Sequence, residues 1–268
     1  MCCKRKFLHR VKSASTGDDK FILKYIHPVN FQYLQEINNR LRGNANHVRL
    51  AVDTIPGKSM FVFEHFTSHL LTVAQKKLPL VVIKRILKDA VTGLAELHDQ
   101  DIVHTYIKPD NIFINWQELG NDIHVEKVQL GDLEDAAHIP LDCDMVRKQA
   151  GNWMWRSPKA HARGPVNKPS DLFSFALFAF ARFTSASSSR FEKKSWKRGV
   201  DKPAVVIELQ ISYFADEEGL NGFLKHLGDN PWFQVFEVTR DEFNQGHHES
   251  HSSTGRALMM TSKTLYVP

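Results

Sequence analysis

The sequence predicts an α+β fold in which a small strand-rich part precedes a larger helical part. Short runs of β-branched and aromatic residues alternate with turn residues up to about residue 66. A long segment with one apolar face follows at residues 80–98, and an almost wholly apolar one at residues 172–183. With 268 residues, 42% of them hydrophobic, the chain is long enough to bury a core in each part.

Four elements are expected in the strand-rich part. The run 21–26 (FILKYI) predicts a strand. Asn30 is expected to cap a helix that ends before Gly43, because asparagine accepts hydrogen bonds at helix starts and glycine favours helix ends. The segments 47–52 and 59–64 predict two strands joined by a proline-glycine turn.

The larger part is expected to be mainly helical. Apolar residues recur at helical spacing through residues 80–98, which makes this the clearest helix of the sequence. A strand at 112–115, an inserted turn at 121–126 and a second strand at 127–130 are expected next. The segment 172–183 predicts a buried helix. Three short helices are expected after it, at 205–213, 220–227 and 231–243.

Composition excludes some classes of protein and favours others. No apolar run reaches the roughly 18–20 residues needed to span a bilayer, so no membrane span is expected. A net charge of +5, without an aromatic-rich RNA-binding signature, does not predict nucleic acid as a partner. Three cysteines form no disulfide framework and no secretory signal is recognised, so a cytoplasmic or nuclear location is expected. The adjacent Cys2 and Cys3 are expected to lie in an unstructured leader.

Two polar segments are expected to carry no core. Residues 184–198 combine serines with basic residues, which is typical of an exposed loop. Residues 245–268 contain closely spaced histidines without an accompanying carboxylate or cysteine ligand set, so a flexible tail is expected there.

The residues with the most specific spacing lie just after the long helix. The segment 104–111 reads HTYIKPDN and precedes a predicted strand, and Asp132 follows the next predicted strand. Both motifs, in this order, resemble the catalytic loop and the metal-binding loop of the eukaryotic protein kinase superfamily. The resemblance covers about residues 21–180. It implies a two-lobed fold with a leader or partial first strands at 1–19, a small N-lobe with its hinge at 20–66, a helical C-lobe at 67–244 and a tail at 245–268.

The resemblance also implies roles for individual residues. Lys24 is similar to the strand lysine that holds ATP phosphates, and Glu36 to the helix glutamate that pairs with that lysine. Glu64 and Phe66 fall in the hinge that binds adenine through its backbone, after Phe63 at the gatekeeper position. In the catalytic loop Lys108 would contact the transferred phosphoryl group.

The metal ligands and the structural anchors of the family also have counterparts here. Asn111 and Asp132 would hold Mg²⁺, because hard oxygen ligands suit that ion. His104 would support the loop architecture, and Asp171 would anchor the catalytic-loop backbone. The implied cofactors are ATP and Mg²⁺, both weakly bound.

Four departures from the family pattern affect catalysis or its activation. Tyr106 stands where the family has the aspartate that acts as general base, and tyrosine is a poor base at neutral pH. Glu134 replaces the glycine of the metal-binding loop, where glycine eases the turn. Lys159 reverses the charge of a glutamate that closes the activation segment. No glycine-rich loop precedes Lys24, so the N-lobe is expected to be truncated.

These departures favour a catalytically impaired kinase-like domain, a pseudokinase, that acts as a binding or regulatory module with a protein partner. An active serine/threonine kinase that transfers the ATP γ-phosphate to protein hydroxyls, with another carboxylate as base, is the first alternative. The second alternative is a truncated kinase fragment without a function of its own.

Overall fold

The computed structural model describes residues 11–17, 19–76, 78–119, 122–146, 149–183, 202–214 and 216–244. The chain divides into two compact units, each described by itself below. Unit 1 comprises Met1–His104 and Pro109–Pro140, and unit 2 comprises Thr105–Lys108 and Leu141–Pro268. This division differs from the boundary after residue 66 in the sequence prediction. The leader residues 1–10, the serine-rich segment 184–198 and the tail 245–268 lie outside the described residues.

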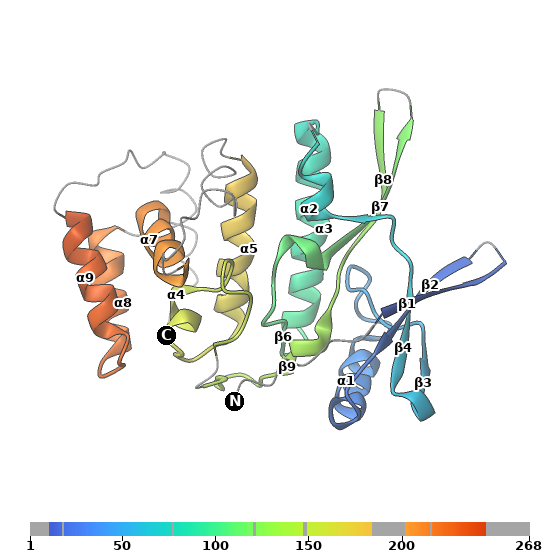
Figure 1. Ribbon diagram of the computed structural model, residues 1–268, viewed down its shortest axis with the longest axis horizontal. Coiled ribbons are helices and arrows are strands. Elements are labelled where there is room, and N and C mark those ends of the chain that lie inside the picture. Colours follow the sequence, from blue (N-terminus) through green and yellow to red (C-terminus); the bar gives the residue numbers. More distant parts are fainter. Residues whose placement is uncertain are drawn as a thin grey trace. The chain divides into compact units, whose positions relative to one another are not determined.

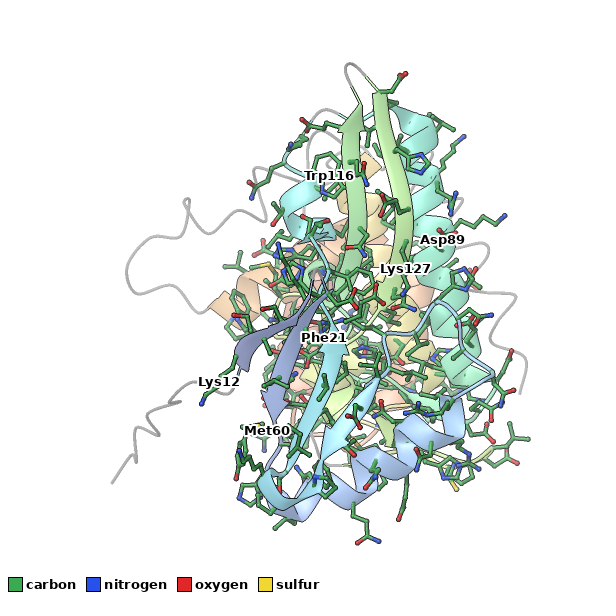
Figure 2. All side chains as sticks on the ribbon, turned by 90° about the vertical axis from the view of Figure 1, so that its right-hand side faces the viewer. Lys12, Phe21, Met60, Asp89, Trp116 and Lys127 are labelled. Carbon is green, nitrogen blue, oxygen red and sulfur yellow. The ribbon has the colours of Figure 1, made fainter. Side chains whose placement is uncertain are left out.

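A four-stranded antiparallel sheet opens unit 1. In spatial order its strands are β1 (Val11–Thr16), β2 (Asp19–Tyr25), β4 (Met60–Glu64) and β3 (Asp53–Ile55). In the register of the two central strands, Phe21 pairs with Glu64 and Tyr25 with Met60. Figure 2 shows Phe21 and Met60 toward opposite ends of this strand pair. The strand predicted at 21–26 is therefore confirmed as β2.

Helix α1 (Pro28–Leu41) contributes its apolar face to the core beside this sheet. The core cluster consists of Ile26, Phe31, Leu34, Ala51 and Phe61. The predicted cap, Asn30, is wrong: His27 is the N-cap residue and its ring accepts a hydrogen bond from the Val29 backbone. Proline at the first helical position explains the earlier start, because its fixed φ suits that position and it needs no partner for an N–H.

The strand predicted at residues 47–52 is also wrong. Val48 makes only an isolated parallel bridge to Leu130, and the strand in this region is β3, one residue further on. The backbone groups are bonded elsewhere: the Arg49 N–H donates to the Leu130 carbonyl, and the Ala51 N–H donates to the Asn38 side chain. The alternating apolar residues at 47–52 therefore belong to a connecting segment and not to a strand.

The long helix α3 (Leu80–His98) has the bounds that the sequence predicts. It packs against β8 (Asp122–Leu130), which pairs with β7 (Ile112–Leu119) in a long hairpin. Figure 2 shows Asp89 of α3 beside the strand pair that carries Trp116 and Lys127. The inserted turn predicted at 121–126 is wrong, because residues 122–126 continue the strand ladder.

Short elements complete unit 1. β5 (Ser68–His69) adds to the edge of β7, and α2 (Leu70–Val73) follows it. β6 (Ile102–Val103) pairs with β9 (Ala137–His138).

Unit 2 is helical in its described residues (Figure 1). Its helices are α4 (Pro158–His161), α5 (Lys168–Phe183), α7 (Lys202–Phe214), α8 (Glu217–Leu227) and α9 (Phe233–Asn244). The last three form a core around the fully buried Phe236, and they confirm the three short helices predicted from the sequence. No helix in the described part of either unit is both long and apolar enough to span a membrane.

Candidate functional site

A cavity of about 300 Å³ lies within unit 1. It is bounded by β2, α1, β4, the segment after β4, β7 and the turn after β8. Its polar lining includes Lys24, Asn38, Arg49, His65, Asp132 and Glu134. Its apolar lining includes Ile22, Leu34, Phe61, Phe63, Phe66 and Phe113. The volume is at the lower limit of small-molecule sites, and the mixture of flat apolar walls with a few charged groups is typical of such sites.

Lys24 forms ion pairs with two carboxylates at one end of this cavity. Its Nζ donates a short hydrogen bond to Asp132 and lies 3.0 Å from Oε1 of Glu134. Burial alone would lower the pKa of Lys24, but the two carboxylates outweigh it and the pKa is raised. Lys24 therefore carries its positive charge at neutral pH, and the carboxylates of Asp132 and Glu134 balance that charge within unit 1.

Glu36, the predicted partner of Lys24, points elsewhere. It is exposed on α1 and accepts a hydrogen bond from Gln32 one turn earlier. Leu34 and Asn38 are the residues of α1 that line the cavity, and neither is ionisable. The helical period explains this outcome: residues 34, 38 and 41 share the inward face, from which position 36 is rotated by about 200° relative to 34.

The turn after β8 brings the two carboxylates to Lys24. Asp132 has φ of +69°, in the left-handed region, and the 3-10 turn Leu133–Asp135 follows it. The expectation that position 134 needs the backbone freedom of glycine is wrong, because the left-handed residue is Asp132, and aspartate tolerates this region better than most residues. Glu134 is thus accommodated within the turn.

Gly131 has a close-packing role just before Asp132. A Cβ at this position would lie 2.9 Å from the Phe113 ring and 3.0 Å from Cβ of Arg49. Its N–H donates to the Asn111 carbonyl (2.8 Å), and its own carbonyl contacts Nε2 of the fully buried His104 (3.0 Å). The structure therefore places Asn111, in the 3-10 turn Pro109–Asn111, on the segment adjoining Asp132.

Phe63, Phe66 and Phe113 form an aromatic part of the lining, the aromatic end of the cavity, and a cation that the sequence prediction missed lies among them. The guanidinium Cζ of Arg49 lies 4.3 Å from the ring centroid of Phe113, 5.0 Å from that of Phe63 and 5.5 Å from that of Phe66. Its Nη2 donates to the Glu64 carbonyl at 2.5 Å. Burial lowers the pKa of Arg49 to about 10, although Glu64 and Asp132 act in the opposite direction.

The two predicted hinge residues lie at this aromatic end. Phe66 is buried and packs edge-on against Phe113. Glu64 contributes its backbone carbonyl to Arg49, whereas its side chain is ion-paired with Lys127 of β8 at 2.5 Å. Of Glu64, only the backbone carbonyl therefore contacts the Arg49 guanidinium at this end of the cavity.

The catalytic-type loop residues Thr105–Lys108 belong to unit 2. The Thr105 N–H donates to the buried carboxylate of Asp171 on α5 (2.9 Å), as the sequence predicts for this anchor. Thr105 has φ of +61°, and the carboxylate holds the loop in this conformation. Nζ of Lys108 lies 5.0 Å from the centre of the Tyr106 ring, a cation–π contact. Lys108 and the residue at the position of the missing general base are therefore in contact with each other.

The segment that follows in unit 2 begins α4 with a side-chain cap. The hydroxyl of Ser157 accepts a hydrogen bond from the Ala160 N–H (3.2 Å) and Pro158 is the first helical residue, an arrangement that favours helix initiation. Lys159 is half-buried, and burial lowers its pKa while Asp144 opposes the shift. Asp144 thus favours the charged form of Lys159, whereas a glutamate at this position would require a basic partner.

Comparison with known proteins identifies the family. The protein kinase domain model matches residues 23–218, which is most of the chain. The chain belongs to the protein kinase domain family. The two-lobed α+β fold that the sequence predicts is thereby confirmed, and a yeast structure agrees with it. A chain of the RNA Pol II CTD kinase CTDK-1 complex has a TM-score of 0.67 and 16% identity, covering 94% of this chain and 79% of that one.

Curated kinases of distant organisms are similar over part of the chain. Human receptor-interacting serine/threonine-protein kinase 1 is 29% identical over 163 residues, which cover 55% of this chain and 23% of that protein. The serine/threonine-protein kinase US3 homolog of varicella-zoster virus is 32% identical over 117 residues, covering 43% of this chain and 28% of that protein. The matched region is thus about a quarter of these relatives' length.

The lysine–carboxylate end of the cavity has the donor chemistry for a metal–phosphate group. Asp132 and Asn111 offer hard oxygen atoms and Lys24 offers a cation for phosphate. Within the described residues, no three or more His, Cys, Asp or Glu side chains are grouped to hold a metal ion. Mg²⁺ usually completes its coordination with substrate phosphates and water, so this donor set fits a metal that arrives with a nucleotide.

Proposed function

We propose that this kinase domain binds nucleotide with Mg²⁺ weakly, is impaired in phosphoryl transfer and acts as a binding or regulatory module for a protein partner. The observation that carries the proposal is Tyr106 in contact with Lys108, at the position of the missing base. A tyrosine side chain is a poor proton acceptor at neutral pH. Loss of a general base alone slows a reaction by roughly 10²- to 10⁴-fold.

The unit 1 residues support nucleotide binding of low affinity. Lys24 would hold phosphate oxygens, while Asp132 and Asn111 would hold Mg²⁺, which supplies charge neutralisation at the phosphates when bound. Glu134 weakens this arrangement, because its carboxylate lies 3.0 Å from Lys24 and competes with phosphate for the same ammonium group. The family's ATP and Mg²⁺ chemistry is retained in part, with an added negative charge beside it.

An active serine/threonine kinase is the second candidate. It is supported by the retained Lys108 and Asp132, and by curated relatives that are named as serine/threonine kinases. Phosphoryl transfer relies mainly on positioning and charge stabilisation, so a domain without the usual base can keep some activity.

Nucleotide binding and phosphate transfer, measured on the same protein, separate the two candidates. ATP binding would be followed by calorimetry with and without Mg²⁺, and transfer by radiolabel incorporation into a generic protein substrate. The proposal expects Mg²⁺-dependent binding that Asp132→Ala abolishes, with transfer at background level. Asp53→Ala, which removes an exposed carboxylate outside the cavity, is the matched control and should bind as wild type does. Robust transfer that depends on Asp132 would instead establish the active kinase.

A further inference from the structure

Arg49 is a buried cation that the proposed function does not use. Its exposed fraction is 8%, and it follows Val48 on a segment where both side chains are buried. Carrying a charge into an apolar environment is unfavourable unless specific contacts compensate for it. The contacts that compensate for the charge of Arg49 therefore indicate which chemical groups fit this end of the cavity.

Those contacts are a backbone acceptor and aromatic faces. One N–H of the guanidinium donates to the Glu64 carbonyl, and the planar group lies among the rings of Phe63, Phe66 and Phe113. Burial lowers the pKa of Arg49 to about 10, against the opposing effects of Glu64 and Asp132, and the side chain remains charged at neutral pH. A flat group with an N–H donor and stacking surfaces satisfies this end of the cavity.

An amino-substituted heterocyclic base has the same properties as the guanidinium. It is planar, it donates an N–H, and it stacks on aromatic side chains. We propose that Arg49 is an internal occupant of the base end of the cavity, so that the base of a nucleotide and the Arg49 guanidinium compete for the Glu64 carbonyl and the phenylalanine rings. The identity of the competing ligand rests on the proposed nucleotide-binding function.

The inward position of Arg49 is not fully satisfied. Its Nε is buried and has no hydrogen-bond partner among the described residues. A donor without a partner loses its interaction with water and gains nothing in return, so the inward position of Arg49 has a free-energy cost. A ligand that must first displace the side chain binds with an apparent affinity reduced by the fraction of molecules whose site is open.

The competition affects the two ends of the cavity differently. Lys24 is paired with Asp132 and with Glu134, whereas the guanidinium of Arg49 donates to the Glu64 carbonyl, so we expect phosphate binding to depend less than base binding on a movement of Arg49. Wild-type protein should therefore gain little affinity from the base: ATP and inorganic tripolyphosphate, each with Mg²⁺, should bind with similar strength.

The test compares Arg49→Met with Arg42→Met, using adenosine, Mg²⁺-tripolyphosphate and Mg²⁺-ATP as probes in calorimetry. Methionine keeps the length and removes the charge and the donors. Arg42 is the matched control, because it is exposed and also donates to a backbone carbonyl, that of Ala51 (3.1 Å), outside the cavity lining. Arg49→Met should raise the affinity for adenosine and ATP by about tenfold or more, the factor that corresponds to breaking one charged hydrogen bond.

Affinity for tripolyphosphate should not rise, because Arg49→Met leaves Lys24 in place and removes a positive charge that acts on Asp132. Adenosine affinity in Arg49→Met that equals that of wild type and Arg42→Met would overturn the proposal. A lower affinity would also overturn it, since Arg49 would then be a ligand contact. A further outcome is that adenosine binds Arg49→Met more tightly than wild type while neither wild type nor either variant binds Mg²⁺-tripolyphosphate or Mg²⁺-ATP. In that case the inference on Arg49 stands and the proposed nucleotide function fails.

The thermal midpoint of each variant shows whether it is folded. If Arg49→Met does not fold, Arg49→Lys carries the test, because lysine keeps a cation at this position and lacks the planar fork. Its adenosine affinity should rise by a few-fold, and an unchanged affinity in folded Arg49→Lys would overturn the proposal.

Discussion

Lys24 and Glu134 form an ion pair at one end of the cavity of unit 1, with 3.0 Å between Nζ and Oε1. Glu134 therefore supplies a carboxylate partner of the kind that the sequence predicts on helix α1. The inward face of α1 offers Leu34 and Asn38 at the cavity, and the glutamate of that helix, Glu36, is exposed. The lysine is thus held in place by the turn that also carries Asp132.

This pairing predicts the effect of Glu134→Gln on nucleotide binding. The amide keeps the size of the side chain and removes the charge that competes with phosphate for Lys24. Because both side chains are partly exposed, the gain is modest: Mg²⁺-ATP should bind about three- to tenfold more tightly, or about 0.7–1.4 kcal/mol. Calorimetry on Glu36→Gln, which neutralises an exposed glutamate outside the cavity, is the control and should show no change. Weaker binding by Glu134→Gln would mean that Glu134 serves to position Lys24 for phosphate.

Tyr106→Asp is predicted to increase phosphate transfer. An aspartate at this position would supply the carboxylate that accepts the hydroxyl proton, and it would lie next to the ammonium group of Lys108. Glu134 and Arg49, which we expect to weaken nucleotide binding, would still be present in this variant. The rate of phosphate transfer should therefore rise by at least about tenfold but by less than the roughly 10⁴-fold upper limit for a general base. Tyr106→Phe keeps the ring and should leave transfer at the wild-type level. Transfer that does not rise in Tyr106→Asp, in protein that binds ATP, would place the defect elsewhere.

Helical and strand elements with strong periodicity were predicted well from the sequence. Helix α3 has the predicted bounds because its apolar face spans five turns without an internal break, and the anchor between Asp171 and the Thr105 backbone followed from the family motif. The segment 47–52 was mistaken for a strand, because its alternating apolar residues belong to a connection that is partly buried. Local periodicity does not reveal which backbone groups will bond to a distant strand.

The candidate site was predicted in part. The sequence identified Lys24 and Asp132, which the structure brings into contact, but it paired Lys24 with Glu36. Arg49 was missed, because arginine in an apolar segment has no signal that distinguishes a buried position from an exposed one. Its surroundings combine the segment 63–66 with the distant Phe113, and only the tertiary structure brings these parts of the chain together around Arg49.

Gly93→Ala is predicted to destabilise unit 1. Gly93 lies in α3, where an added Cβ would be 2.4 Å from the His47 carbonyl oxygen, far inside contact distance. The neighbouring His47 is fixed by two contacts of 2.8 Å to Glu96 on the same helix, so it cannot yield easily. The free energy of unfolding should fall by about 1–3 kcal/mol, as for other overpacked sites.

Gly222→Ala is the matched control for that substitution. Gly222 lies in α8 and has no atom within 4 Å of the added Cβ, so only the helix propensity changes. Alanine should stabilise this helix by about 0.5–1 kcal/mol. Chemical denaturation measures the free energy of unfolding of each variant, and hydrogen exchange measures the local change in α3 and in α8. Equal and small changes in the two variants would contradict the close packing of α3 against His47.

His161 on α4 predicts how the stability of unit 2 depends on pH. Its exposed fraction is 1%, and burial first, then the charge of Arg156, lower its pKa to about 3, while a backbone hydrogen bond from the Trp153 segment opposes the shift. In the unfolded chain the pKa is about 6.5. Below that pH the unfolded state binds a proton that the folded state excludes. The contribution of His161 to stability is therefore fully present above pH 6.5 and is lost as the pH falls toward 3, by up to about 1.4 kcal/mol per pH unit.

Hydrogen exchange in residues 149–166 between pH 7 and pH 4 measures this loss within unit 2, with rates corrected for intrinsic pH dependence. His161→Gln replaces the imidazole by a neutral side chain that does not titrate, so its protection should depend less on pH than that of wild type. His226→Gln removes an exposed histidine of α8 in the same unit and should keep most of the wild-type slope. A wild-type slope that persists in His161→Gln would assign the acid sensitivity to other groups, such as ion-paired carboxylates, which also lose their stabilising effect as the pH falls.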